Sequence, residues 1–315
     1  MANLEKICIK YAVIILNYNT IDDAIAAAES VNRMSKTDRF IICIADNASS
    51  KKGDTEKCAT LRIPHVVTRC VEQNKGYAYG NNDAIRWIKE QYQADYYIIM
   101  NPDVLILNEG TIEGMIDSIE NSPKYIVGGQ PLVWNCFYPG NPSCQQNIRM
   151  IPNYGDLCIL SCLPLKLIFR KRFKKITYMD QIPYEQHIEY MVPSGAFFII
   201  KADIFEEIGL FDENTFLYFE EQILGKKLEY IGKKLLFMPE YMVRHEHGKS
   251  TGNNHYSLNK RAMKSGRDSH LYYAKEYLKV GKIKLGFLCF LHIIDYVAQM
   301  FRVGINKMIK NHTKT

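Results

Sequence analysis

Four short apolar runs in the first hundred residues alternate with segments of helical spacing, and this alternation constrains the fold more than any other feature. The runs cover residues 12–16, 40–45, 65–71 and 96–100, and helical spacing fills 21–34 and 76–90. Apolar runs that alternate with amphipathic helices are typical of βαβ units. The sequence therefore predicts an α/β fold in which helices flank a mostly parallel central sheet.

Polar residues follow these apolar runs at the points where the strands end. Asp46 ends the second run, Asn74 lies just beyond the third, and Asp103 follows the fourth. Ligands of open parallel sheets bind outside the carboxyl ends of the strands, so we expect these three side chains to converge on one ligand. The alternative is that they only form turns, and their recurrence along the chain disfavours it.

The basic residues are concentrated in the last quarter of the chain. Residues 241–315 hold fourteen Lys/Arg against four Asp/Glu, a net +10, which leaves −4 for residues 1–240 of the total of +6. Such a surface suits phosphates on nucleic acid, anionic lipid or a phosphorylated substrate. Because the basic residues accompany apolar segments and no nucleic-acid recognition module, we expect no nucleic-acid partner.

Two segments combine apolar and basic residues in a way that indicates a membrane surface. The apolar run 157–169 is shorter than the about 20 residues that span a bilayer, and the basic run 170–175 follows it. It fits either the headgroup region of an anionic membrane or a core segment with a solvated end.

Two helices are expected near 257–278 and 283–309. The second one lies on a membrane or packs on a partner, because it carries polar residues early and basic ones late: Asp295, Gln299, Arg302, Lys307, Lys310 and Lys314.

The expected location is the cytoplasm, peripheral on the inner face of the cell membrane. The N-terminus lacks a charged start, a long apolar stretch and a small-residue cleavage site. Nine scattered cysteines form no C-x-x-C pair, which favours reduced thiols.

Two further groups carry side chains suited to chemistry. Glu220 and Glu221 stand at the expected start of a helix that runs to about residue 231, where they could act as acid or base or only complement the helix dipole. His245 and His247 have a spacing compatible with a metal. With Asp103 and ligand phosphates, such an imidazole would suit Mg²⁺ or Mn²⁺.

Eight motifs occur in the order found in glycosyltransferase family 2, and the sequence resembles in particular its bacterial rhamnosyltransferase-like members. The resemblance implies a GT-A fold with a Rossmann-like sheet, an inverting mechanism and a nucleotide-sugar donor (a dTDP- or UDP-sugar, with rhamnose favoured). It also implies a glycan or lipid-linked acceptor in cell-surface polysaccharide synthesis, such as lipopolysaccharide or capsule. The motifs are Ile14–Asn19, Ala45–Ser49, Asn74–Asn82, Asn101–Asp103, Ser194–Ala196, Gly209–Glu213, Tyr218–Glu221 and His245-x-x-Gly248-x-Ser250.

The resemblance also implies roles for single residues. Glu221 stands where the family has the aspartate that acts as catalytic base, and Asp103 takes the metal-binding place of the D-x-D motif, with His245 completing the metal site. Ile223 departs from the family, which commonly has an acid there. The residues implied to bind substrate are Asn17, Asp46, Asn74, Gly76, Asn101, Ser194, Gly195, Ala196 and Glu220.

The expected organisation is a GT-A domain over residues 1–255 and a helical, basic, membrane-associating extension over 256–315. Within the domain, a nucleotide-binding half covers about 1–133 and an acceptor-side half about 134–255, of which 134–190 is less regular. A homo-oligomer stays open. Two other functions also stay open: a non-catalytic nucleotide- or carbohydrate-binding protein of the same fold, and a sugar-nucleotide nucleotidyltransferase. The latter is disfavoured because no glycine-rich, arginine-containing loop follows the first strand.

Overall fold

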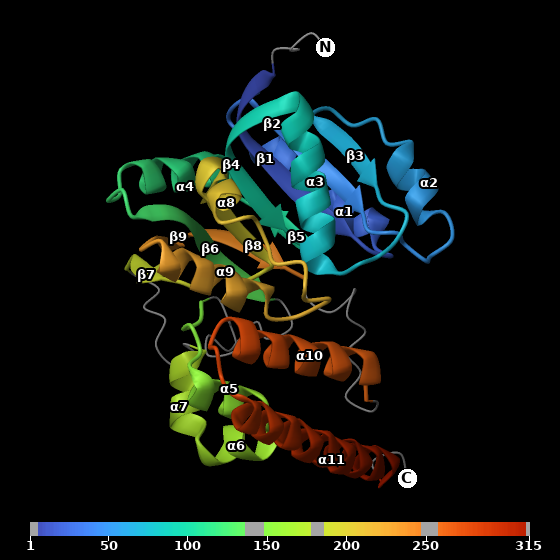
Figure 1. Ribbon diagram of the computed structural model, residues 1–315. Coiled ribbons are helices and arrows are strands. Elements are labelled where there is room, and N and C mark those ends of the chain that lie inside the picture. Colours follow the sequence, from blue (N-terminus) through green and yellow to red (C-terminus); the bar gives the residue numbers. More distant parts are fainter. Residues whose placement is uncertain (1–5, 136–147, 178–185, 247–257, 313–315) are drawn as a thin grey trace.

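A mixed β-sheet forms the body of the molecule and a layer of helices lies beneath it (Figure 1). The computed structural model describes residues 6–135, 148–177, 186–246 and 258–312. The strands are β1 (Ile7–Asn17), β2 (Phe40–Asp46), β3 (Val66–Cys70), β4 (Tyr92–Met100), β5 (Val104–Ile106), β6 (Ile126–Asn135), β7 (Ile188–Tyr190), β8 (Phe197–Lys201) and β9 (Lys234–His245).

The described strands follow the order β3-β2-β1-β4-β8-β6-β9-β5, with β7 paired to β9. The predicted parallel sheet is confirmed for β3, β2, β1 and β4. Beyond β4 the sheet is mixed, because β8 runs antiparallel to both β4 and β6. This reversal places the start of β8 beside the end of β4, where Met100 pairs with Phe197. A distant segment, residues 194–196, thereby reaches the carboxyl edge of the parallel strands.

Both faces of the sheet are covered, which explains the continuous apolar runs. Val13 and Ile15 face one core with α1 and α4, whereas Ala12 and Ile14 face the other core with α3, α8 and α9. The alternation follows from the two-residue period of a strand. These helices and a short one after β2 are α1 (Ile21–Met34), α2 (Asp54–Ala59), α3 (Tyr77–Gln91), α4 (Thr111–Glu120), α8 (Ala202–Glu207) and α9 (Glu220–Tyr230).

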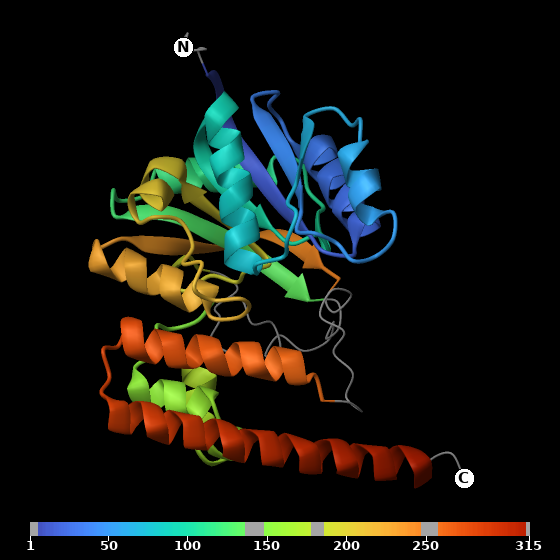
Figure 2. The same ribbon diagram turned by 45° about the vertical axis from the view of Figure 1, so that its right-hand side comes forward.

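The lower layer joins two parts of the chain that are far apart in sequence (Figure 2). A third apolar cluster unites Leu157 and Cys162 with Tyr273 and Leu288. The described part of residues 134–190 thus includes three short helices. The first two pack on the C-terminal pair, and the third packs on the first two. These helices are α5 (Tyr154–Leu160), α6 (Leu163–Ile168), α7 (Arg170–Ile176), α10 (Lys260–Glu276) and α11 (Lys282–His312).

The apolar segment 157–169 divides between the two environments that its sequence left open. Its first half is buried in the third cluster, whereas Leu167, Ile168 and Phe169 are exposed. By length and composition alone, α11 is the one helix in the described ranges that could cross a membrane. The side chains of Lys307 and Lys310, and all of Lys314, lie outside the part of the chain that is described.

Candidate active site

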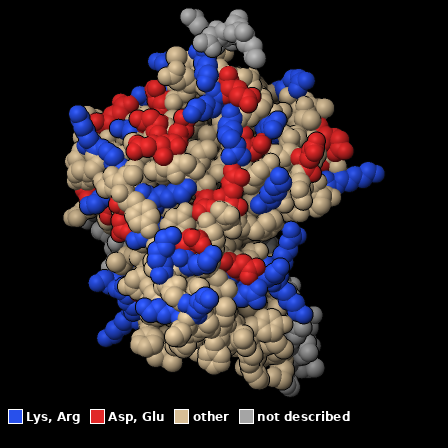
Figure 3. All heavy atoms as spheres, in the orientation of Figure 1, with Lys and Arg blue, Asp and Glu red and all other residues tan. Residues whose placement is uncertain are grey.

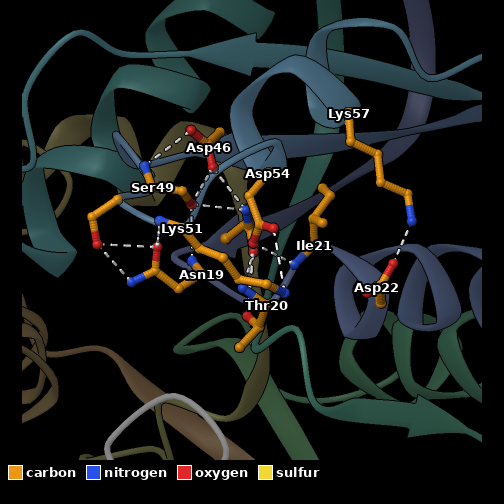
Figure 4. Close-up of polar contacts among 11 residues, drawn as sticks. Asn19, Thr20, Ile21, Asp22, Asp46, Ser49, Lys51, Asp54 and Lys57 are labelled. Carbon is orange, nitrogen blue, oxygen red and sulfur yellow. Dashed lines mark hydrogen bonds and ion pairs between the residues drawn. The ribbon is translucent and has the colours of Figure 1, made fainter.

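The first part of the site is a loop network at the carboxyl ends of β1 and β2, centred on Asp46 (Figure 4). Asn17 donates from Nδ2 to Asp46 Oδ1 at 2.7 Å, and Ser49 donates its amide and hydroxyl to the same carboxylate. Thr55 Oγ1 donates to Oδ2 at 2.7 Å. Asp46 and Asn17 are both buried, so their hydrogen bonds fix the shape of the loops at this edge of the sheet from inside the protein.

The second part joins Asn74 to the start of α3. Asn74 Oδ1 accepts from the Gly76 amide at 3.0 Å and from Asn47 Nδ2 at 3.2 Å, and Asn47 also donates to the Gly76 carbonyl. The Tyr77 amide then donates to the Phe216 carbonyl at 3.0 Å. The loops that follow β2 and β3 are therefore held against the segment that precedes α9.

Gly76 is required by this close approach. Its φ is +110°, and a Cβ at this position would lie 2.4 Å from the Phe216 carbonyl oxygen. A side chain would therefore meet both backbone strain and a clash with backbone atoms that cannot swing away. The absence of a side chain at Gly76 thus permits close packing between this loop and the backbone of the segment that precedes α9.

The third part contains the paired carboxylates. The Tyr77 hydroxyl donates to the Gly195 carbonyl at 3.0 Å. A Cβ on Gly195 would lie 2.1 Å from Glu221 Oε1, so the absence of a side chain at 195 gives this carboxylate its place. Burial raises the pKa of Tyr77 well above its ordinary value, and the charges of Glu221 and then Glu220 add to the rise. Tyr77, Gly195 and Glu221 therefore form one cluster.

Glu220 and Glu221 have different environments although they are neighbours. Glu220 is 3% exposed, and burial, followed by the charge of Glu221, raises its pKa to about 8. Glu221 is partly exposed. Neighbouring carboxyl groups in different environments are typical of acid–base sites. The backbone before them is strained, since Tyr218 and Phe219 have φ of 73° and 76°.

Asp103 and His245 form the fourth part. β5 pairs antiparallel with β9, and Val104 lies opposite His245. His245 Nε2 is 3.2 Å from Asp103 Oδ1, and both side chains are buried. The Asn101 amide donates to the Ala196 carbonyl at 2.8 Å, and the backbone amide of Ser194 donates to Gln130 Oε1. Asp103 thus stands close to the Ser194–Ala196 segment that also accommodates Glu221.

This pair fits a divalent cation that a substrate helps to bind. Among the described residues, no group of three or more His, Cys, Asp or Glu side chains could hold a metal ion. Mg²⁺ needs only one or two carboxylates when phosphates and water supply the rest of its octahedral shell. Adjacent ligands about 2.1 Å from such an ion are about 3 Å apart, and the Asp103–His245 separation of 3.2 Å agrees with that spacing.

The predicted site residues therefore lie along one continuous edge. The contacts run from Asn17 and Asp46 to Asn74 and Gly76 by way of Asn47, and on to Gly195 and Glu221 by way of Tyr77. From there Ala196 contacts Asn101, two residues before Asp103. His247, Gly248 and Ser250 lie outside the described residues. The sequence did not single out Asn47, Tyr77 or Gln130. Asn47 and Tyr77 lie inside quoted motifs, but no spacing argument marks Gln130.

Two sequence features prove to have structural explanations. Asp212 accepts hydrogen bonds from the Tyr272 and Tyr277 hydroxyls, which ties the Gly209–Glu213 motif to α10 and the residue after it. Ile223 is fully buried in the third cluster. A charged side chain at this position would be desolvated between α9 and the helical layer, so the site favours an apolar residue.

A family comparison agrees with this arrangement. The glycosyl transferase family 2 model matches residues 12–209. The chain belongs to glycosyl transferase family 2. As a family 2 glycosyltransferase it carries Asp46, Asn74, Asp103 and Gly195 inside the matched region, whereas Glu221 and His245 lie beyond it. Its membership in a family of glycosyltransferases disfavours a sugar-nucleotide nucleotidyltransferase, and measurement of donor turnover separates a transferase from a non-catalytic binding protein of the same fold.

Curated relatives of this glycosyltransferase are transferases of rhamnose or hexoses. An N-acetylglucosaminyl-diphospho-decaprenol L-rhamnosyltransferase of Mycobacterium tuberculosis is 26% identical over 222 residues, 67% of this chain and 68% of the relative. A hexosyltransferase of low-salt glycan biosynthesis from Haloferax volcanii is 24% identical over 210 residues, 67% of this chain and 58% of that relative. The rhamnosyltransferase WbbL of Escherichia coli is 22% identical over 175 residues, 54% of this chain and 60% of WbbL.

Solved structures confirm the GT-A fold of the glycosyltransferase. A mannosyltransferase from Pyrobaculum calidifontis, in complex with GDP-mannose and Mn²⁺, gives a TM-score of 0.54 at 12% identity and covers 94% of this chain and 72% of that chain. GalNAc-T7 with UDP, GalNAc and Mn²⁺ gives a TM-score of 0.58 at 17% identity, over 86% of this chain and 49% of that chain.

Gly195→Ala is expected to impair catalysis without unfolding the protein. The new methyl group would overlap the end of the Glu221 side chain, which can rotate away, and displacing a reacting group by about 1 Å costs on the order of 100-fold in rate. Turnover and thermal unfolding are measured side by side. Gly286→Ala is the control, because a Cβ there meets no atom within 4 Å. Wild-type turnover in Gly195→Ala would refute the assigned place of the carboxylate.

Glu220→Gln is expected to remove a pH dependence of stability. The folded-state pKa of about 8 exceeds the ordinary 4.5, so the folded chain binds a proton that the unfolded chain has released between these values. Wild-type stability therefore falls as pH rises through this window. Relative to wild type, the variant is expected to gain at least about 1.4 kcal/mol between pH 5 and 8.5, the equivalent of one pKa unit. Urea unfolding at both pH values measures it, and an equal effect at both would contradict it.

Proposed function

We propose that the chain is an inverting glycosyltransferase that moves a sugar from a nucleotide-sugar donor to a hydroxyl of a lipid-linked or polysaccharide acceptor. Rhamnose from a dTDP-sugar is the favoured donor group, supported by the two rhamnosyltransferases among its relatives, with UDP-sugars as the other choice. The observation that carries the proposal is the position of Glu221. It meets Gly195 on the same edge as the Asp46 network and the Asp103–His245 pair.

The proposed chemistry is a single displacement. Glu221 accepts the proton of the acceptor hydroxyl as that oxygen attacks the anomeric carbon, and the bond to the nucleoside diphosphate breaks on the opposite side. The pKa of buried Glu220 is raised to about 8, so this carboxyl group stays protonated at neutral pH and limits the negative charge beside the attacking oxygen. The loops around Asn17, Asp46, Asn74 and Gly76 hold the nucleotide.

Asp103 and His245 would hold the divalent cation, Mg²⁺ or Mn²⁺. When bound, the cation supplies positive charge for the departing diphosphate. Asn101 and Ser194–Ala196 position the donor between this pair and Glu221 through their backbone contacts.

The proposed organisation retains a GT-A domain over 1–255 and a basic helical extension over 256–315, on the inner face of a cell membrane. Packing of α5 against α10 and of α6 against α11 supports a role for the acceptor-side half in this layer. The name of the mycobacterial relative, which includes a decaprenol diphosphate, supports a lipid-linked acceptor.

A donor screen tests the proposed function. Purified full-length protein is incubated with Mn²⁺ or Mg²⁺ and with dTDP-, UDP- or GDP-sugars, with and without a polyprenyl-diphosphate sugar, while release of nucleoside diphosphate is followed. We expect turnover with one donor, and product analysis with inverted anomeric configuration. Retained configuration, or no turnover with any donor and acceptor pair, would overturn the proposal.

A further inference from the structure

One side of α11 exposes a long row of large apolar side chains. They recur every three or four residues, so they lie along one face of the helix. Ile283, at the start of the row, is 91% exposed. Soluble proteins rarely expose apolar surface on this scale without a partner. The exposed residues are Ile283, Phe287, Phe290, Ile293, Val297, Met300, Phe301, Ile305 and Met308.

A second exposed apolar group comes from a different part of the chain and lies on the neighbouring helix. Leu167, Ile168 and Phe169 end α6 and begin α7, with exposed fractions of 68%, 71% and 51%. α6 packs directly on α11. We call the α11 row and these three residues together the apolar face.

Basic side chains border the apolar face. Arg170, Lys171 and Lys175 on α7 are exposed, as are Lys282 and Lys284 at the start of α11. Figure 3 shows largely uncharged atoms at the lower end of the molecule, with Lys and Arg gathered above them. An apolar surface with a cationic border matches the interior and headgroups of an anionic bilayer.

The packing of α11 decides how it lies on such a bilayer. Leu288 and Leu291 are buried in the third cluster, and Asp295 Oδ1 accepts from the Leu163 amide at 2.7 Å, which caps α6. A helix that crossed the bilayer would lose these contacts and carry Asp295 into hydrocarbon. These contacts therefore favour an orientation in which α11 lies parallel to the bilayer surface.

We propose that the apolar face is one docking surface for an anionic bilayer, in which α11 lies in the plane of the membrane and α6 inserts its tip beside it. A second copy of the chain fits the face less well, because a symmetric interface would bring the two cationic borders together. Docking on a bilayer would bring the proposed active site to a lipid-linked acceptor, and only this consequence rests on the proposed function. The docking itself does not require catalysis.

Flotation of the full-length protein with vesicles tests the docking. We expect it to float with phosphatidylglycerol–phosphatidylcholine vesicles and to bind pure phosphatidylcholine at least about tenfold more weakly, since each basic residue near the surface adds about 1 kcal/mol. Ile168→Glu and Phe290→Glu, made separately, are each expected to weaken binding at least about tenfold. Leu107→Glu is the control, because Leu107 is exposed outside this face. Wild-type binding by either face variant would overturn the two-helix surface.

The orientation of α11 is tested with Phe287→Trp and Phe301→Trp in vesicles that carry bromine at a shallow or a deep acyl position. For a helix in the membrane plane, the added fluorescence of both variants is quenched equally, and more by the shallow bromine. Unequal depths would show a crossing helix and overturn the proposal. A dimer of the wild type in sedimentation experiments without lipid, if Phe290→Glu dissociates it, would also overturn the proposal. None of these readouts depends on donor turnover, so a failure here is distinct from a failure of the proposed function.

Discussion

Glu221→Gln is expected to lower the turnover number roughly 100- to 10,000-fold, the usual contribution of a general base. The amide keeps the length and shape of the side chain beside Gly195, where Glu221 Oε1 fills the space of a missing Cβ, but it cannot accept the acceptor's proton. Donor affinity is expected to stay near wild type, because the proposed nucleotide contacts centre on Asp46 and Asn74, away from Glu221. Steady-state turnover and calorimetric titration with the donor nucleotide separate the two effects.

Glu229→Gln is the matched control for this experiment. Glu229 lies near the other end of α9 on its exposed side, where it pairs with Lys226. The same substitution there tests whether a charge change on this helix alters turnover by itself. If Glu221→Gln retains more than about a tenth of wild-type turnover while Glu229→Gln is unaffected, another group must act as base.

The sequence predicted the parallel half of the fold because its strands are continuous apolar runs and its helices are long. Val13 and Ile15 pack on one face and Ala12 and Ile14 on the other, as a strand covered on both faces requires. It did not predict α5–α7, whose six or seven residues are shorter than a window in which helical period can be measured. β5, α4 and β6 were also not assigned. β6 contains Gly128 and Gly129, and two glycines inside a strand obscure its pattern.

The sequence indicated the individual residues of the candidate site, but it did not indicate the contacts that join them. Asp46, Asn74 and Asp103 follow strands that end at one edge, so the sequence could place them there. The contact of Gly195 with Glu221 joins a loop before β8 to the start of α9, and no local pattern encodes it. Ile223 shows the same limit. Its departure from the family was visible in the sequence, but its burial against Tyr273 and Leu288 depends on helices far along the chain.

Asp103→Asn is expected to reduce turnover at least about 100-fold and to abolish the dependence of donor binding on Mn²⁺. The variant keeps the size of the side chain that meets His245 at 3.2 Å, but it removes the negative charge that would attract a divalent cation. Several kcal/mol of stabilisation of the departing diphosphate would be lost with the cation, and about 2.7 kcal/mol corresponds to 100-fold.

Calorimetric titration of the donor nucleotide with Mn²⁺ and with chelator measures the metal dependence directly. Asp95→Asn is the control, because Asp95 lies on β4, the strand that leads to Asp103, away from its carboxyl end and exposed to solvent. The wild type is expected to bind the nucleotide more tightly with Mn²⁺, the Asp95 variant to behave like it, and the Asp103 variant to bind equally in both conditions. If turnover is unchanged both in Asp103→Asn and in chelator-treated wild type, Asp103 does not hold a cation, and the diphosphate must instead be stabilised by the protein's own positive groups.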